Sequence, residues 1–185
     1  MTRQILFVHG AGEGAYAADA VLAQSLRRAL GAGYSLRYPQ MPDEAAPAYG
    51  AWRSQIAQEL AALDGPVTLV GHSLGASVLL KYLVEVQPAQ PVAGLFLTAT
   101  PYWGAPDWEV DEYRLPDGFA AWLPEGLPLF LYHCRDDEIV PFAHLGLYAQ
   151  QLPRATVRAI ERGGHQLGED LSVVAHDIER LAAGG

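Results

Sequence analysis

Short apolar runs alternate along the chain with stretches of helical periodicity, and this alternation restricts the fold more than any other feature. Runs typical of buried strands occur at residues 5–8, 34–38, 67–70, 95–97, 129–133 and 155–160. Segments of helical character occur between and after them, at residues 16–30, 49–63, 74–86 and 171–181. Strands that alternate with helices predict a mostly parallel sheet with helices on both faces. We therefore expect a single α/β domain over residues 1–185, a three-layer α/β/α sandwich of about six strands.

Residues 100–128 interrupt this pattern, because they show no clear period. The segment contains Trp103, Trp108 and Trp122 together with several prolines. A long irregular segment inside a compact domain is usually functional, so we expect a small lid or pocket wall here, with the tryptophans lining the substrate site. Aromatic side chains fill cores equally well, and the alternative is an irregular surface excursion that packs its own tryptophans.

The composition excludes several kinds of function. The 185 residues have a formal net charge of −9, and Lys81 is the one lysine among scattered arginines, so a nucleic-acid surface of clustered cations is not expected. Cys134 is the single cysteine, which rules out an internal disulfide. The apolar run at residues 5–8 is too short for a signal-peptide core or a membrane span. We therefore expect a cytoplasmic protein without a membrane span.

The sequence Gly71-His72-Ser73-Leu74-Gly75 stands between a predicted strand and a predicted helix. The pattern G-x-S-x-G is short, but this context is the one in which it presents a nucleophile. The flanking glycines let the strand and the helix pass close together without Cβ clashes. The sharp turn lifts the hydroxyl clear of the sheet and directs the helix N-terminus toward a reacting carbonyl. We therefore predict that Ser73 is a nucleophile.

This motif and the order of the elements resemble the α/β-hydrolase superfamily over essentially the whole chain. Within the superfamily, the short length and the opening strand are similar to the small serine hydrolases related to retinoblastoma-binding protein 9. The resemblance implies an α/β-hydrolase fold that lacks the first two strands of the superfamily's larger sheet. It also implies that the catalytic residues follow one another in the order serine, acid, histidine.

A serine hydroxyl needs a base, and the histidines after Ser73 are the candidates. His165 follows two glycines directly after the last predicted strand, and a histidine in that loop resembles the catalytic histidine of the superfamily. His133 falls inside a predicted strand and is expected to be a packed core residue. His144 lies in a helical stretch, and His176 lies off the apolar face of the last helix. We therefore predict His165 as the base.

Two adjacent aspartates after the fifth predicted strand compete for the role of the acid. The stretch from Asp137 to Pro141 resembles the superfamily's D-x-x-V-P, which carries the acid at its first position, so Asp137 is predicted to orient the histidine. Asp136 is expected to shape the turn by accepting hydrogen bonds from backbone amides. Glu138 is expected to be solvated.

Two backbone N–H groups are expected to hold the oxyanion of the tetrahedral intermediate. One is that of Leu74, and the other is that of Ala11, because His9-Gly10-Ala11 matches the superfamily's H-G-x loop. A dinucleotide loop is the alternative for this glycine-rich stretch, but Ala15 stands where the last glycine of G-x-G-x-x-G is required. The dispersed histidines do not have the spacing of metal ligands. Neither a cofactor nor a metal is therefore expected.

Together these residues predict acyl transfer from a small ester to water through an acyl-serine intermediate. The same triad would serve a thioesterase or an amidase. The alternative outside catalysis is a protein-interaction module that has kept a hydrolase fold, which the name of the related family suggests. The sequence does not reveal a protein partner.

Overall fold

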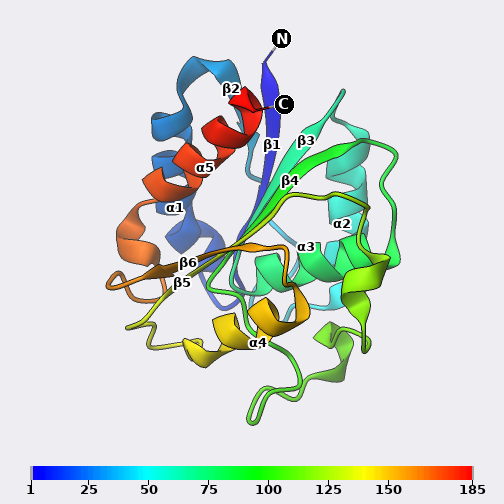
Figure 1. Cartoon of the computed structure of the whole chain (residues 1–185), viewed down its shortest axis with the longest axis vertical. Helices are drawn as coiled ribbons and strands as arrows, with labels where there is room; N and C mark the ends of the chain where they lie inside the picture. The colour runs from blue at the N-terminus through cyan, green and yellow to red at the C-terminus, as the bar shows by residue number, and fades with distance from the viewer. Residues whose placement is uncertain (1, 185) are drawn as a thin grey trace.

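The computed structural model describes residues 2–184. Six strands form one sheet in the order β2-β1-β3-β4-β5-β6, and every neighbouring pair is parallel (Figure 1). The strands are β1 (Arg3–Val8), β2 (Tyr34–Arg37), β3 (Val67–His72), β4 (Val92–Thr98), β5 (Leu129–Cys134) and β6 (Thr156–Ile160). The α-helices are α1 (Ala15–Leu30), α2 (Tyr49–Ala61), α3 (Leu74–Glu85), α4 (Ala143–Gln151) and α5 (Ser172–Ala183). The predicted parallel sheet is therefore confirmed.

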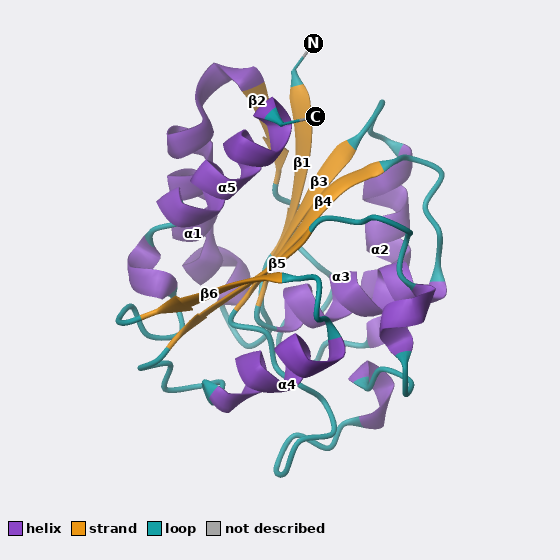
Figure 2. Ribbon diagram, in the orientation of Figure 1, coloured by secondary structure: helices purple, strands orange, loops and turns teal. Residues whose placement is uncertain are grey.

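The helices cover both faces of the sheet and give three layers (Figure 2). Helices α1 and α5 pack together on one face, whereas α2, α3 and α4 lie on the other. Alternate side chains of a strand point to opposite faces. In β1, Ile5 and Phe7 accordingly join the core beneath α1 and α5, while Leu6 and Val8 join the core beneath α2 and α3. This arrangement confirms the predicted α/β/α sandwich.

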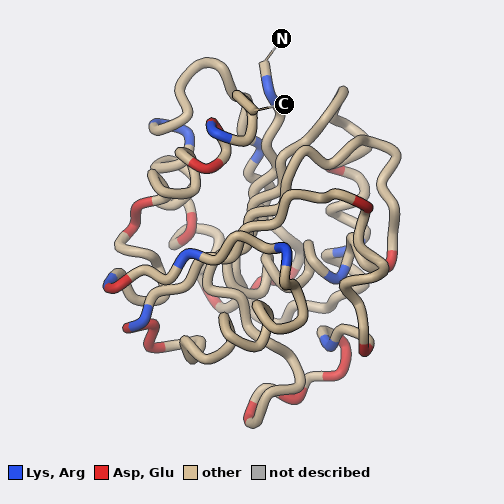
Figure 3. Tube along the Cα trace, viewed as in Figure 1, with Lys and Arg blue, Asp and Glu red and all other residues tan. Residues whose placement is uncertain are grey.

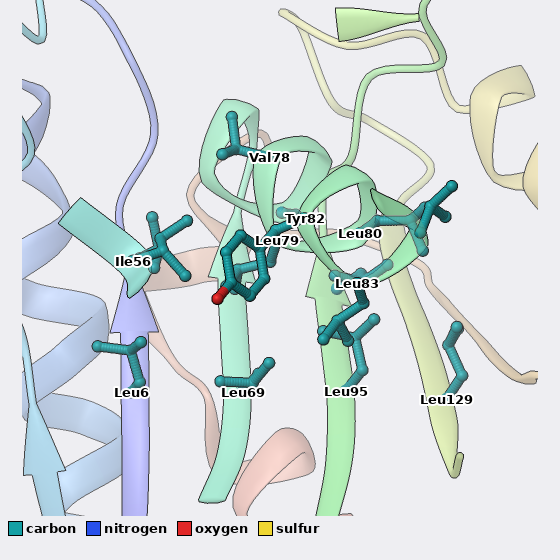
Figure 4. Close-up of a cluster of buried hydrophobic side chains, with 14 of the residues drawn as sticks. Leu6, Ile56, Leu69, Val78, Leu79, Leu80, Tyr82, Leu83, Leu95 and Leu129 are labelled. Carbon is teal, nitrogen blue, oxygen red and sulfur yellow. The ribbon is translucent and has the colours of Figure 1, made fainter. Parts of the chain in front are cut away.

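A row of leucines joins neighbouring strands under helix α3. Leu6, Leu69, Leu95 and Leu129 are successive register partners in β1, β3, β4 and β5, and Figure 4 shows them side by side below the side chains of α3. Ten of the 12 residues of α3 are buried. A helix that is apolar on nearly all sides belongs to the interior of its domain. The elements on both sides of Ser73 are therefore fixed in the core.

The residues Lys, Arg, Asp and Glu lie mainly along the outer helices and loops (Figure 3). Strands β3, β4 and β5 at the centre of the sheet contain no Lys, Arg, Asp or Glu. This distribution follows from the high cost of burying a charge that has no partner. Within residues 2–184, no helix is both long enough and apolar enough to cross a membrane.

Residues 100–128 form an irregular excursion that is attached to the domain by its own aromatic side chains. Trp103 packs against Trp108 with ring centroids 5.4 Å apart and against Tyr113 at 5.0 Å. Tyr113 and Phe119 lie in short 3-10 turns and join the core around α3. Trp122 is 56% exposed. The excursion is thus attached to α3 through Tyr113 and Phe119, whereas residues 109–112 are exposed.

Candidate active site

Ser73 lies at the sharp turn between β3 and α3, with φ 52° and ψ −123°. A positive φ is strained for a residue with a Cβ, and such strain is characteristic of functional turns. A Cβ on Gly71 would lie 2.6 Å from the Cα of Ala76, and one on Gly75 would lie 2.2 Å from the carbonyl oxygen of His9. Both obstacles are backbone atoms, so only glycine fits at these positions. The steric role predicted for the two glycines is confirmed.

Asp137 and His165 are joined by a hydrogen bond. The Nδ1 atom of His165 lies 3.1 and 3.0 Å from the two carboxylate oxygens of Asp137. Because a carboxylate only accepts hydrogen bonds, Nδ1 carries a proton, and in the neutral ring Nε2 is left with a free lone pair. The Asp137 side chain is completely buried, whereas that of His165 is 11% exposed. His165 therefore has the tautomer and the access that a general base requires.

Asp137 accepts further hydrogen bonds that keep it ionised. His133 Nε2 lies 3.0 Å from its carboxylate, and the backbone N–H groups of Ile139 and Val140 donate to it at 2.9 and 2.8 Å. Burial alone would raise the pKa of the Asp137 carboxyl, but the N–H donors of His133, His165 and the backbone outweigh burial and hold the pKa well below its usual range. His133 is buried in β5 as predicted, but its contact with the acid was missed.

The two neighbours of Asp137 bind the backbone of the histidine loop. Asp136 accepts hydrogen bonds at 3.0 and 2.9 Å from the N–H groups of the two glycines that precede His165. Its predicted role as an acceptor of backbone amides is confirmed, although these amides belong to the histidine loop and not to its own turn. Glu138 accepts the N–H of His165 at 3.0 Å. Glu138 is exposed, as expected, but its hydrogen bond to the His165 backbone was not predicted.

The histidine loop lies against the turn that carries Ser73. The His165 ring centroid is 4.8 Å from that of His72, the residue before Ser73. Among residues 2–184, no hydrogen bond joins Ser73 directly to His165. Hydrogen bonds between nucleophile and base are often long without substrate and tighten in the substrate complex. The structure therefore brings Ser73, His165 and Asp137 together at the carboxyl ends of the parallel strands.

The loop after β1 passes beside Ser73. A Cβ on Gly10 would lie 3.1 Å from the Cβ of Ser73. The Gly10 carbonyl accepts a hydrogen bond from His9 Nδ1 at 2.6 Å, and because a trans peptide directs its N–H away from its C=O, this bond fixes the direction of the Ala11 N–H. Within residues 2–184, neither the Ala11 nor the Leu74 N–H donates to another group of the protein. Both predicted donors are thus free to bind an oxyanion.

The three tryptophans of residues 100–128 occupy different positions. Trp103 and Trp108 form one aromatic cluster, and Trp108 also packs against His144 of α4 at 5.3 Å. The Trp103 Nε1 N–H is buried and has no hydrogen-bond partner among residues 2–184. Trp122 lies apart on an exposed turn. A role for these side chains in binding substrate remains a prediction.

The fold and the strained serine turn define an α/β hydrolase. The chain belongs to the serine hydrolase family, whose model matches residues 24–171. It is also 25% identical over 175 residues to YdeN from Bacillus subtilis (strain 168), across 92% of this chain and 89% of YdeN. The range matched by the family model, residues 24–171, contains Ser73, Asp137 and His165 and begins after Ala11.

Solved structures show the same fold. The ydeN gene product of B. subtilis superimposes with a TM-score of 0.81 at 23% identity, covering 98% of this chain and 100% of that chain. For alpha/beta hydrolase domain-containing protein 10 from mouse the TM-score is 0.67 at 21% identity, with 100% and 91% of the chains covered. For Arabidopsis thaliana SOBER1 it is 0.70 at 17% identity, with 98% and 100% covered. The narrower similarity to retinoblastoma-binding protein 9 stays a prediction.

Proposed function

We propose that the protein hydrolyses small carboxylic esters through an acyl intermediate on Ser73. The observation that carries this proposal is the hydrogen bond from His165 Nδ1 to the buried Asp137 carboxylate. It leaves Nε2 of His165 as a proton acceptor in a loop that packs beside the nucleophile turn. A strained serine next to such a base is the arrangement that acyl transfer requires.

The reaction proceeds in two halves. Ser73 Oγ attacks the ester carbonyl while His165 Nε2 takes its proton, and the N–H groups of Ala11 and Leu74 bind the oxyanion. Asp137 stabilises the imidazolium that forms. The tetrahedral intermediate collapses, and the C–O bond to the alcohol breaks as the alkoxide takes the proton from His165. Water then attacks the acyl-Ser73 carbonyl by the same steps, which releases the acid and the free serine.

The proposed acyl site is short, and residues 100–128 form its wall. Proline stiffens this segment, and exposed charged residues such as Asp107 and Glu109 oppose its folding over a long hydrocarbon tail. The unpartnered Trp103 N–H is a donor that a polar group of a bound ligand would satisfy. These features favour a small, partly polar substrate over the long acyl chain of a lipid.

The acyl-chain preference of the purified protein tests this proposal. Each methylene buried in the site contributes about 0.8 kcal/mol, or roughly fourfold in kcat/KM, for as long as the site has room. We expect kcat/KM for p-nitrophenyl esters to peak between acetate and butyrate and to fall by eight carbons. Matched thioesters and anilides measure the preference for the leaving group, and the Ser73→Ala protein gives the background rate.

Two outcomes of this experiment count against the proposal. A steady rise in kcat/KM through twelve or sixteen carbons would show a long acyl groove and contradict the short pocket. If anilides or thioesters are turned over much faster than esters of the same acyl group, the protein is an amidase or a thioesterase on the same triad.

A further inference from the structure

His72 and Asp19 form a buried pair beneath Ser73 that the proposed reaction does not use. Their side chains are 1% and 2% exposed, and His72 Nδ1 lies 2.7 Å from Asp19 Oδ2. The other ring nitrogen, Nε2, lies 2.9 Å from the backbone carbonyl oxygen of His165. A carbonyl oxygen only accepts, so Nε2 is protonated, and the short contact at Nδ1 holds the second proton.

Asp19 is the acceptor of three donors. Its Oδ2 accepts the Gly10 N–H at 2.7 Å in addition to His72, and its Oδ1 accepts Gln166 Nε2 at 3.0 Å. A carboxylate has lone pairs for all three donors, whereas a protonated carboxyl would turn one oxygen into a donor. Although burial would raise the pKa of Asp19, the charge and the hydrogen bond of His72 lower it. The pair therefore consists of a carboxylate and an imidazolium.

The pair connects three segments that come from different strands. Gly10 belongs to the loop after β1, His72 ends β3, and His165 and Gln166 belong to the loop after β6. The Gly10 N–H belongs to the peptide group that directly precedes the Gly10–Ala11 peptide, and the latter carries the Ala11 N–H. Hydrogen bonds from one pair thus fix the oxyanion loop and the base loop relative to the serine turn.

We infer that the His72–Asp19 ion pair has a positioning role: it holds Ala11 and His165 in place relative to Ser73. The inference rests on the proposed function, because it assigns a task within that site. A buried ion pair is weak evidence of a gain in stability, since the desolvation of both ions offsets their attraction. Its hydrogen bonds instead specify one arrangement of the loops, and catalytic groups must be held to within about 0.5 Å of the productive geometry.

The charged and titratable groups around the His72 ring favour the charged pair. Asp19 faces it directly, Asp137 lies on its His165 side, and His9 lies on its Gly10 side. Burial alone would lower the pKa of His72, but Asp19, the His165 carbonyl and Asp137 raise it. Burial also lowers the pKa of His9, so that ring is neutral and does not oppose the His72 cation. The two charges of the pair cancel, and no net charge is placed beneath Ser73.

The substitution Asp19→Asn breaks this connection in a defined way. The amide has one acceptor oxygen, and its NH₂ group must face at least one of the donors that now bind the carboxylate. An amide oxygen at the Oδ2 position can still accept from Gly10 and His72, and the NH₂ group then faces Gln166. The amide carries no charge, however, so the buried His72 ring loses its counterion and gives up one proton. A neutral ring donates from only one nitrogen, and the link through His72 to the His165 carbonyl is then broken at one end. A displacement of about 1 Å, or a misdirected oxyanion donor, costs roughly 100-fold in rate. We expect kcat for the best ester to fall roughly 10- to 100-fold with little change in KM.

Asp177→Asn is the matched control. Asp177 is likewise buried, with a side chain that is 3% exposed. It also accepts three hydrogen bonds, from Tyr132 Oη, Arg158 Nε and Arg158 Nη2 at 2.8, 3.1 and 2.8 Å. Neither partner belongs to the candidate site. The control therefore reproduces the loss of a buried carboxylate and its cost in stability without loosening the site loops, and its kcat should remain close to that of the unmodified protein.

A second measurement determines the protonation of the His72 ring directly and does not depend on activity. In ¹H–¹⁵N spectra of the histidine rings at pH 8, above the ordinary pKa of about 6.5, both His72 nitrogens should carry protons. The amide resonances of Ala11 and His165 should move in Asp19→Asn and not in Asp177→Asn. A neutral His72 ring, or equal kcat values for the two variants, would overturn the inference. If the unmodified protein hydrolyses none of the acyl substrates, the proposed function fails, while the ring and amide signals still decide the role of the pair.

Discussion

Replacing Ser73 by alanine is expected to abolish both ester hydrolysis and covalent labelling by a fluorophosphonate, while the protein remains folded. The probe forms a bond to an activated serine oxygen, and the substitution removes that atom. In serine proteases, loss of the nucleophile costs roughly a millionfold in kcat. Alanine keeps the Cβ, so the strained backbone at φ 52° is not changed and stability is preserved. Intact-mass spectrometry should find one adduct on the unmodified protein and none on the variant.

Ser77 provides a control within the same helix. It lies one turn after Ser73, is 2% exposed, and donates its hydroxyl to the Pro101 carbonyl at 3.2 Å. Ser77→Ala should therefore keep its adduct. An adduct that persists in Ser73→Ala, or a folded unmodified protein without any adduct, would remove Ser73 from the role of nucleophile and favour the interaction-module alternative.

The second large effect is expected for Asp137→Asn. An asparagine amide group would direct N–H donors at His165 Nδ1 or at His133, where the carboxylate now accepts their protons. His165 would then favour the tautomer with its proton on Nε2, which is unable to take a proton from Ser73. In serine proteases this substitution costs about 10⁴ in kcat. Steady-state kinetics on the best ester measure the loss.

Asp136→Asn is the neighbouring control. Asp136 binds only the backbone N–H groups before His165, and an asparagine oxygen can still accept them. We expect near-normal kcat and a loss of about 1 kcal/mol or less in the free energy of unfolding. Thermal unfolding of both variants separates catalysis from stability. A larger loss of kcat at Asp136 would exchange the roles of the two aspartates.

The sequence predicts those parts of the fold that depend on local patterns. Apolar runs and helical periodicity identify the strands and the main helices, because each pattern reflects which face of an element is buried. Ser73 is predicted from its motif, whereas Asp137 and His165 are predicted from their places after the last two strands. The irregular path of residues 100–128 has no period, so its packing against α3 could not be derived.

The polar contacts around the triad depend on packing between distant segments. His72 bonds Asp19, 53 positions earlier, and His165, 93 positions later, and no local pattern predicts either contact. One signal was present for Asp19. It lies on the same face of α1 as the buried residues Leu22 and Leu26, where a carboxylate is too costly without partners. A charged residue on an apolar helical face therefore indicates a buried polar network.

The sheet order places the residues of the candidate active site in regions of different local stability. Ser73 stands between β3 and α3 in the middle of the domain, whereas His165 follows β6, which pairs only with β5 at the margin of the sheet. Proteins open locally at their margins at a lower free energy than at their centres. If β6 and its loop detached in this way, the proposed base would be withdrawn while the nucleophile turn stayed intact. Local opening at this edge strand would therefore stop the proposed hydrolysis reversibly, without unfolding of the whole domain.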